Sequence, residues 1–217
     1  MILEKMAEFF EARLDGYDDH MLRNIAGAHE FYPFTAQLLP MMPDAKVLDL
    51  GCGTGLELGY YFALNPAASV TGIDLSYKML MNLKEKFPVQ DLTLICGSYF
   101  DIPLVENTYD AVVSVESLHH FTMVQKLPLY QKVFHTLTEK GYFILTDYFS
   151  LSDMEEADHF ADLARLKAEN GISDQEFYHY DTPLTVSHET QVLLEAGFSK
   201  VEILRSWGPT YTLKATK

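Results

Sequence analysis

The chain has 217 residues, of which 48% are hydrophobic and 22% are charged. This composition is typical of a globular protein and excludes an intrinsically disordered one, and the length favours a single domain. The 31 acidic and 16 basic residues give a net charge of −15. Because that charge repels phosphate groups, the sequence disfavours a protein that binds nucleic acid.

The sequence also suggests the compartment in which the protein works. No run approaches the ~18–20 apolar residues that cross a bilayer, and acidic residues interrupt the first apolar segment, so we expect neither a membrane span nor a signal peptide. Two cysteines, Cys52 and Cys96, are too few for a disulfide scaffold and lack the spacing of a metal site. We therefore expect a cytoplasmic monomer or homodimer that needs no metal.

The predicted elements start with an amphipathic helix near the N-terminus, and from Ala45 onward short β-rich runs alternate with helical patterns. Strands are predicted at 46–50, 69–73, 92–96, 109–115, 142–146, 201–206 and 210–215. Helices are predicted at 56–64, from the capping Ser76 to Phe87, from Pro128 in a first turn to Gly141, and from Ser187 to Gly197.

This alternation predicts an α/β fold in which helices cover both faces of a seven-stranded, mostly parallel sheet. The last two strands are separated by too few residues for a crossover, so they should pair antiparallel near the sheet edge. We expect one domain with four parts: an N-terminal helical cover (1–44), a core (45–150), an insertion (151–183) and a C-terminal helix with a strand pair (184–217).

The insertion at 151–183 breaks the alternation, because nine acidic and two basic residues follow the fifth strand. Its position predicts that it overhangs the carboxyl edge of the sheet. It is either a solvated helical insertion or a helical lid over a substrate pocket, and the two interpretations are compatible.

The most informative motif is the glycine turn at 51–55, which follows the first strand and precedes a helix. Such turns at the carboxyl ends of central strands bind nucleotides. Leu56 stands where a dinucleotide-binding motif needs a third small residue, and the Gly-Lys-Ser/Thr ending of a phosphate loop is missing. Asp74, directly after the second strand, is placed to accept the hydroxyl groups of a ribose, although it could instead cap the next helix.

In this order, the segments DLGCGTG, GIDLS, GSYFDIP, YDAVVSVESLHHF and KGYFILTDY resemble the class I S-adenosylmethionine-dependent methyltransferases, in particular their small-molecule branch. The resemblance runs from about Tyr17 to the C-terminus. It implies a Rossmann-like three-layer sandwich that binds S-adenosyl-L-methionine, transfers its methyl group to a small-molecule acceptor and releases S-adenosyl-L-homocysteine.

The resemblance also implies which residues hold the cofactor. In the family an acid after the third strand receives the adenine amino group, and here that position is Ser98, so this contact differs. The cofactor-binding residues implied are Tyr17, Asp49, Gly51, Cys52, Gly53, Gly55, Asp74, Leu75, Met79, Ser98, Tyr99 and Val115.

Methyl transfer is an in-line displacement, so orientation and the exclusion of water are the main tasks, and a base helps only a protonated acceptor. His119, after the fourth strand, is the candidate catalytic base because imidazole titrates near neutral pH; alternatively it is packed as structure. The predicted substrate pocket contains Glu116, His120, Asp147, Tyr148, Tyr178 and Tyr180. Four aromatic residues either form a wall around the acceptor or pack in the core: Tyr148, Phe149, Tyr178 and Tyr180.

Three other functions remain open. The acceptor could be a tRNA base or a protein side chain, although the acidic charge counts against nucleic acid. The chain could be a catalytically silent cofactor-binding subunit that activates a partner, although the intact glycine turn and Asp74 disfavour this. A nicotinamide dehydrogenase is disfavoured by Leu56.

Overall fold

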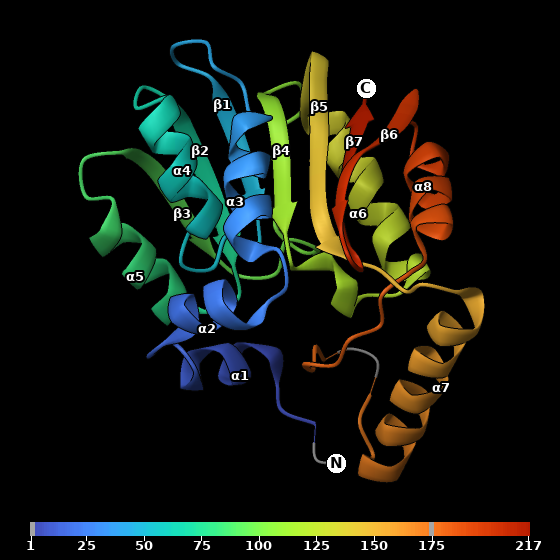
Figure 1. The fold of residues 1–217 in the computed structure, drawn as a ribbon. Coiled ribbons are helices and arrows are strands. Elements are labelled where there is room, and N and C mark those ends of the chain that lie inside the picture. Colours follow the sequence, from blue (N-terminus) through green and yellow to red (C-terminus); the bar gives the residue numbers. More distant parts are fainter. Residues whose placement is uncertain (1–2, 174–175) are drawn as a thin grey trace.

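The computed structural model describes residues 3–173 and 176–217. Seven strands form one sheet in the order β3-β2-β1-β4-β5-β7-β6 (Figure 1). The strands are β1 (Lys46–Leu50), β2 (Ser69–Asp74), β3 (Asp91–Cys96), β4 (Tyr109–Val115), β5 (Leu137–Tyr148), β6 (Lys200–Trp207) and β7 (Thr210–Thr216). The first five are parallel, whereas β7 pairs antiparallel with both β5 and β6. The predicted sheet with one reversed strand near its edge is confirmed.

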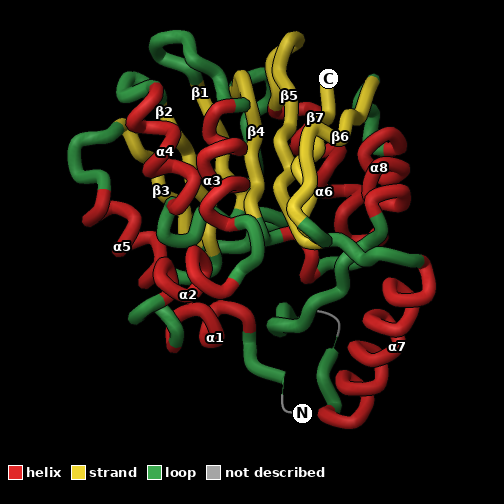
Figure 2. The backbone as a smooth tube through the Cα atoms, in the orientation of Figure 1, coloured by secondary structure: helices red, strands yellow, loops and turns green. Residues whose placement is uncertain are grey.

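Helices cover both faces of this sheet (Figure 2). They are α1 (Met6–Ala12), α2 (Tyr17–Asn24), α3 (Ala28–Gln37), α4 (Leu56–Leu64), α5 (Tyr77–Lys86), α6 (Met123–Thr136), α7 (Asp153–Asn170) and α8 (Val186–Glu195), with a 3₁₀ turn η1 (Leu118–His120). Alternate strand residues face opposite layers, because Leu48 packs in one core with α6 and α8 while Val47 packs in another with α3, α4 and α5. The result is the predicted three-layer sandwich.

The prediction around Pro128 was wrong by about one and a half turns. Thr122 caps α6 in a capping box with Gln125, so the helix begins at Met123 and Pro128 lies inside it. The helix also ends earlier than predicted, and β5 begins at Leu137 with Gly141 inside the strand. A register shift in the pairing of β4 with β5 accommodates this extension.

The predicted insertion contains α7, which extends away from the sheet (Figure 1); residues 174 and 175 lie outside the described residues. The chain then returns through residues 176–185, here called the return segment. Its backbone is bonded to the N-terminal region, from Met6 N to Phe177 O at 3.0 Å, and to η1, from Thr182 N to His119 O at 2.8 Å. The return segment, α1 and α2 together cover the carboxyl edge of the sheet.

None of the described helices combines the length and the hydropathy needed to cross a membrane. The longest described helix, α7, has 18 residues and is rich in charged side chains.

Candidate functional site

Two of the three glycines in the turn between β1 and α4 have different physical roles. Gly51 has a φ of 76°, and a Cβ atom there would lie 2.1 Å from the Ser117 hydroxyl oxygen, so only glycine allows this close packing. Gly53 has a φ of 47°, and a Cβ atom there would meet nothing within 4 Å. The backbone at Gly53 therefore borders open space.

Asp74 at the end of β2 is bonded to this turn. Its Oδ2 accepts a hydrogen bond from the Gly53 amide at 2.9 Å, and its Oδ1 accepts one from the Ser76 amide at 2.8 Å. Burial raises the pKa of Asp74, while these two hydrogen bonds act in the opposite direction. Asp74 does not cap α5, because the N-cap residue is Ser76, whose hydroxyl accepts a hydrogen bond from the Met79 amide.

Asp74 lines a small cavity of about 50 Å³, here called the inner pocket. The inner pocket is closed on one side by Met6, Phe10 and Tyr17 of the N-terminal region. Its other lining residues are Gly51, Gly53, Asp74, Leu75, Met79, Tyr99, Val115, Glu116, Ser117 and His120. Eight of the twelve predicted cofactor residues, Tyr17 included, line the inner pocket.

The other four predicted cofactor residues, Asp49, Cys52, Gly55 and Ser98, line neither described pocket. Asp49 lies fully buried at the base of the turn, and both of its carboxylate oxygens lack a hydrogen-bond partner. Burial, then the neighbouring Glu57 carboxyl group, raises the pKa of Asp49 well above its usual range. Because no donor reaches this buried carboxyl group, it can accept a hydrogen bond from a ligand at the base of the turn.

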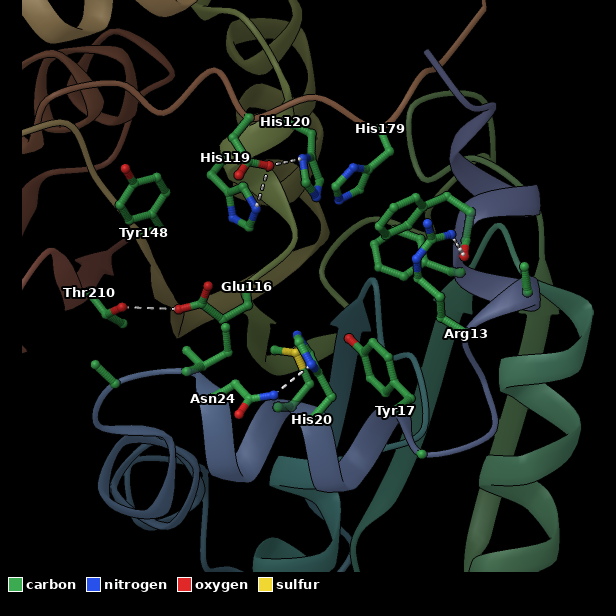
Figure 3. A pocket seen from close by; sticks show the side chains of 18 of the residues that line it. Arg13, Tyr17, His20, Asn24, Glu116, His119, His120, Tyr148, His179 and Thr210 are labelled. Atoms are coloured by element: carbon green, nitrogen blue, oxygen red, sulfur yellow. Dashed lines mark hydrogen bonds and ion pairs between the residues drawn. The ribbon is translucent and has the colours of Figure 1, made fainter. Parts of the chain in front are cut away.

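A larger cavity of about 900 Å³, here called the outer pocket, adjoins the inner one (Figure 3). Much of its wall comes from α1, α2 and the residues that connect them. The lining residues are Phe9, Phe10, Ala12, Arg13, Asp15, Gly16, Tyr17, His20, Met21, Asn24, Ile25, Ala26, Glu116, His119, His120, Tyr148, His179, Asp181, Pro209 and Thr210. The two pockets share Phe10, Tyr17, Glu116 and His120.

His119 enters the outer pocket from η1 and is held from behind by Asp147. Its Nδ1 lies 2.5 Å from Asp147 Oδ1, and the Asp147 carboxylate also accepts hydrogen bonds from the Leu118 and Tyr148 amides. This pairing directs the Nε2 of His119 toward the return segment, where it lies 3.6 Å from Asp181 Oδ1. Burial lowers the pKa of His119, but the Asp147 and Asp181 carboxylates outweigh it and raise the value to about 9.

Asp181 on the return segment joins two histidines at the pocket wall. Its Oδ1 lies 3.1 Å from His120 Nδ1 and 3.6 Å from His119 Nε2. Burial, together with the charge of His119, lowers the pKa of His120. The donor atoms of His119, His120 and Asp181, and separately of Glu116, His119 and Asp147, lie within 4.8 Å of one another. That spacing suits a cation, but the ion pairs of His119 with the two aspartates account for the clustering without one.

Glu116 is the strained residue of the site. Among the described residues, positive φ angles outside glycine occur at Asp44, Asn107 and Glu116, with 50° at Glu116. Asp and Asn tolerate this region, whereas other L-residues lose about 1–2 kcal/mol there. The Glu116 amide is bonded to Thr146 O at 2.8 Å, and its Oε1 accepts from the Thr210 hydroxyl at 3.3 Å. Such strain at the end of a central strand is typical of functional sites.

The predicted substrate residues are only partly brought together. Glu116, His120 and Tyr148 line the outer pocket, and Asp147 orients His119 from behind. Tyr178 and Tyr180 do not line it. Phe149, the other proposed aromatic, is 1% exposed and packs in the core. The predicted lid helix α7 contributes no lining residue to the outer pocket, whereas the return segment contributes His179 and Asp181.

Sequence reasoning missed the part of the wall that comes from the N-terminus. Phe9, Arg13 and His20 face the outer pocket, but nothing local marks them, because their position depends on how α1 and α2 pack on the sheet edge. The one available signal was the amphipathic first helix, whose Phe10 lines both pockets. His179 could not be placed either, although it stacks on Phe9 with ring centroids 3.5 Å apart.

A glycine turn after the first strand and a carboxylate after the second, at the carboxyl edge of this sheet, define a Rossmann-like nucleotide-binding α/β protein. The family model of a methyltransferase domain matches residues 47–141. An uncharacterized methyltransferase of Synechocystis sp. is 33% identical over 124 residues, which are 57% of each chain. A carboxy-S-adenosyl-L-methionine synthase of Campylobacter fetus subsp. fetus is 24% identical, over 99% of this chain and 96% of the relative.

Among solved structures, a putative O-methyltransferase from Nostoc punctiforme has a TM-score of 0.70 and 24% identity, over 97% of this chain and 60% of that one. The matches therefore cover little more than half of the length of the Synechocystis and Nostoc proteins, but nearly all of the length of the Campylobacter relative. Residues 47–141 therefore match a methyltransferase domain, and the relatives and the fold together support a class I S-adenosylmethionine-dependent methyltransferase.

Proposed function

We propose that the protein transfers a methyl group from S-adenosyl-L-methionine, held in the inner pocket, to a small-molecule acceptor held in the outer pocket. The observation that carries this proposal is that the two pockets meet, with Phe10, Tyr17, Glu116 and His120 in both walls. A group bound in one pocket therefore has a direct path to a molecule in the other.

The residues of the inner pocket fit an adenosyl amino acid. Asp74 offers a carboxylate for ribose hydroxyls, Leu75 and Met79 offer apolar surface for a base, and the open backbone at Gly53 allows a close approach. The buried Asp49 carboxyl group, without a hydrogen-bond donor, suits the neighbourhood of an amino group. Bound there, the cofactor would supply an electrophilic methyl group on a positively charged sulfur atom.

The inner pocket must widen to admit this group, since about 50 Å³ is far below the roughly 300–1,000 Å³ of ligand pockets. The residues that close it belong to the N-terminal region. Asp18 on α2 accepts a hydrogen bond from the Thr54 hydroxyl at 2.5 Å and pairs with Lys86 on α5. We infer that α1 and α2 move apart from the sheet edge when the cofactor enters, and then exclude water during transfer.

His119 is the residue that takes up the acceptor's proton. Asp147 fixes its Nδ1, so its Nε2 is the nitrogen left for proton transfer. At neutral pH the raised pKa keeps His119 protonated, so the base form must be generated first.

The size and charge of the outer pocket support a small acceptor. Its volume of about 900 Å³ lies within the range of small-molecule sites. The Asp181 carboxylate in the wall and the net charge of −15 count against a nucleic acid. Both cysteines are free thiols, which is consistent with a reducing cytoplasm.

A second candidate is the synthesis of a carboxylated S-adenosyl-L-methionine, because a relative with that name matches from end to end. An anionic co-substrate would need a free cation in the outer pocket. The cations that line that pocket are already paired: the Arg13 guanidinium with the Glu4 carboxylate at 3.0 and 3.2 Å, and the protonated His119 with Asp147 and Asp181. The geometry therefore favours methyl transfer.

Thermal unfolding with S-adenosyl-L-methionine, S-adenosyl-L-homocysteine, NAD and NADP tests the cofactor. A ligand at about 100 times its dissociation constant adds about 2.7 kcal/mol to the free energy of unfolding. We expect stabilisation by the two adenosyl compounds, and stabilisation by the nicotinamides alone would refute the proposal. Mass spectrometry of the cofactor after incubation with a metabolite pool then separates the candidates: methyl transfer yields S-adenosyl-L-homocysteine, the second candidate a heavier, carboxylated cofactor.

A further inference from the structure

Glu116 occupies the one place that donor and acceptor must share. It is the carboxylate among the four residues that line both pockets (Figure 3). A methyl group that moves between the pockets has to pass this junction. Any positive charge carried by the donor is therefore felt by Glu116.

The backbone fixes Glu116 at the junction. Its strained φ of 50° is held by the hydrogen bond from its amide to Thr146 O, which continues the pairing of β4 with β5. Its side chain is bonded on one side to the Thr210 hydroxyl of β7. Since a glutamate with this φ is costly, its retention needs an explanation in the site and not in the fold.

We propose that Glu116 determines cofactor specificity: its carboxylate at the pocket junction makes the protein bind the charged methyl donor in preference to the neutral, demethylated product. This inference rests on the proposed function. A carboxylate stabilises a nearby sulfonium, and it gains nothing from the thioether that remains after transfer. Release of the product would then be favoured by the chemistry itself.

The preference depends on whether Glu116 is ionised. Burial, then the Asp147 carboxylate, raises the pKa of Glu116 to about 8, while the positive charge of His119 and the Thr210 hydroxyl oppose this rise. Asp181 acts on it from the return segment, and Tyr17 and Tyr32 face it from α2 and α3. Below pH 8 the free carboxyl group is protonated, so the preference for the charged donor should increase as pH rises through 8.

Isothermal titration of the full chain with S-adenosyl-L-methionine and with S-adenosyl-L-homocysteine tests this without turnover. The measured quantity is the affinity for S-adenosyl-L-methionine divided by the affinity for S-adenosyl-L-homocysteine, at pH 6 and at pH 9. The amino acid part is common to both ligands, so its contribution cancels in this ratio. We expect Glu116→Gln to lower the ratio by on the order of tenfold at pH 9, and to change it little at pH 6. His119 titrates in both proteins, so the difference between them isolates Glu116.

Two control variants sharpen the experiment. Glu116→Asp keeps the charge and should retain most of the preference at pH 9. Asp19→Asn removes an exposed charge on α2 that lines neither pocket, and it should leave the ratio unchanged. If Glu116→Gln does not fold, His119→Gln takes its place: without the imidazole, a rise of the ratio between pH 6 and pH 9 comes from Glu116, and a flat ratio refutes its role.

The outcomes are distinguishable. A protein that binds neither adenosyl compound refutes the proposed function. If the protein binds both compounds, two results refute only the role of Glu116. One is a ratio at pH 9 that is the same in Glu116→Gln and in the wild type, and the other is a wild-type ratio that does not change with pH.

Discussion

The inner and outer pockets are built in different ways. The inner pocket is made largely of backbone and apolar side chains around two carboxyl groups, Asp74 and Glu116, and most of it comes from the carboxyl ends of β1, β2 and β4. Half of the residues that line the outer pocket are titratable, and most of these come from α2, the residues between α1 and α2, η1 and the return segment. This difference teaches that the sheet itself carries the proposed cofactor site, whereas the chemistry of the proposed acceptor site depends on segments added around the sheet.

The sharpest way to separate the two pockets is His119→Ala. Loss of a general base lowers turnover by about 10²–10⁴-fold, whereas the inner pocket keeps all its residues, since His119 does not line it. The measurements are the initial rate with an identified acceptor and the thermal shift with S-adenosyl-L-homocysteine. Unchanged turnover with normal cofactor binding would show that the catalytic role is wrong.

Asp74→Ala should break the inner pocket alone. The variant loses the carboxylate for the ribose and the acceptor of the Gly53 and Ser76 amides. The cofactor-induced stabilisation, about 2.7 kcal/mol at 100 times the dissociation constant, should disappear. The readout is the difference between free and loaded protein, so a lower stability of the free variant does not disturb it. A retained shift would mean that Asp74 holds only the turn.

The outer pocket should reveal itself in the pH dependence of stability. The folded-state pKa of His119, about 9, lies above the unfolded value of 6.5, so its contribution is complete below pH 6.5 and is lost as pH rises through 9. We expect the free energy of unfolding in urea to fall by about 1–2 kcal/mol over this interval. Glu116, whose pKa is also raised, acts in the same direction. In His119→Gln the fall should be smaller, and an equal fall would contradict the assignment.

The smallest effect concerns the movement that connects the pockets. Asp18→Asn weakens the contacts of α2 with Thr54 and Lys86. Because the side chains of Asp18 and Lys86 are partly exposed, the free energy of unfolding should fall by at most ~1 kcal/mol. Cofactor association in stopped flow should become a few-fold faster, because the inner pocket opens more often. The matched control is Asp19→Asn, which removes only an exposed pair with Arg23. Equal rates in both variants would show that α2 does not limit entry.

The extent of prediction from sequence follows the same division. The glycine turn and Asp74 were predictable because local spacing sets their positions relative to β1 and β2. The start of α6 was misplaced because the capping box of Thr122 and Gln125 was overlooked in favour of Pro128. Asp181 and His20 escaped notice because they reach the site only through long-range packing. The pKa of His119 escaped for the same reason, since it depends on carboxylates 28 and 62 residues away in sequence.

The return segment and the N-terminal helices are bonded to each other, through Met6 with Phe177 and through the stacked rings of Phe9 and His179. They form one rim over the carboxyl edge of the sheet. Exchange of this rim would change most of the wall of the outer pocket but only Met6, Phe10 and Tyr17 in the wall of the inner pocket, so the residues that follow β1, β2 and β4 would stay in place. Chimeras that graft a relative's rim onto this sheet are a natural route to altered selectivity.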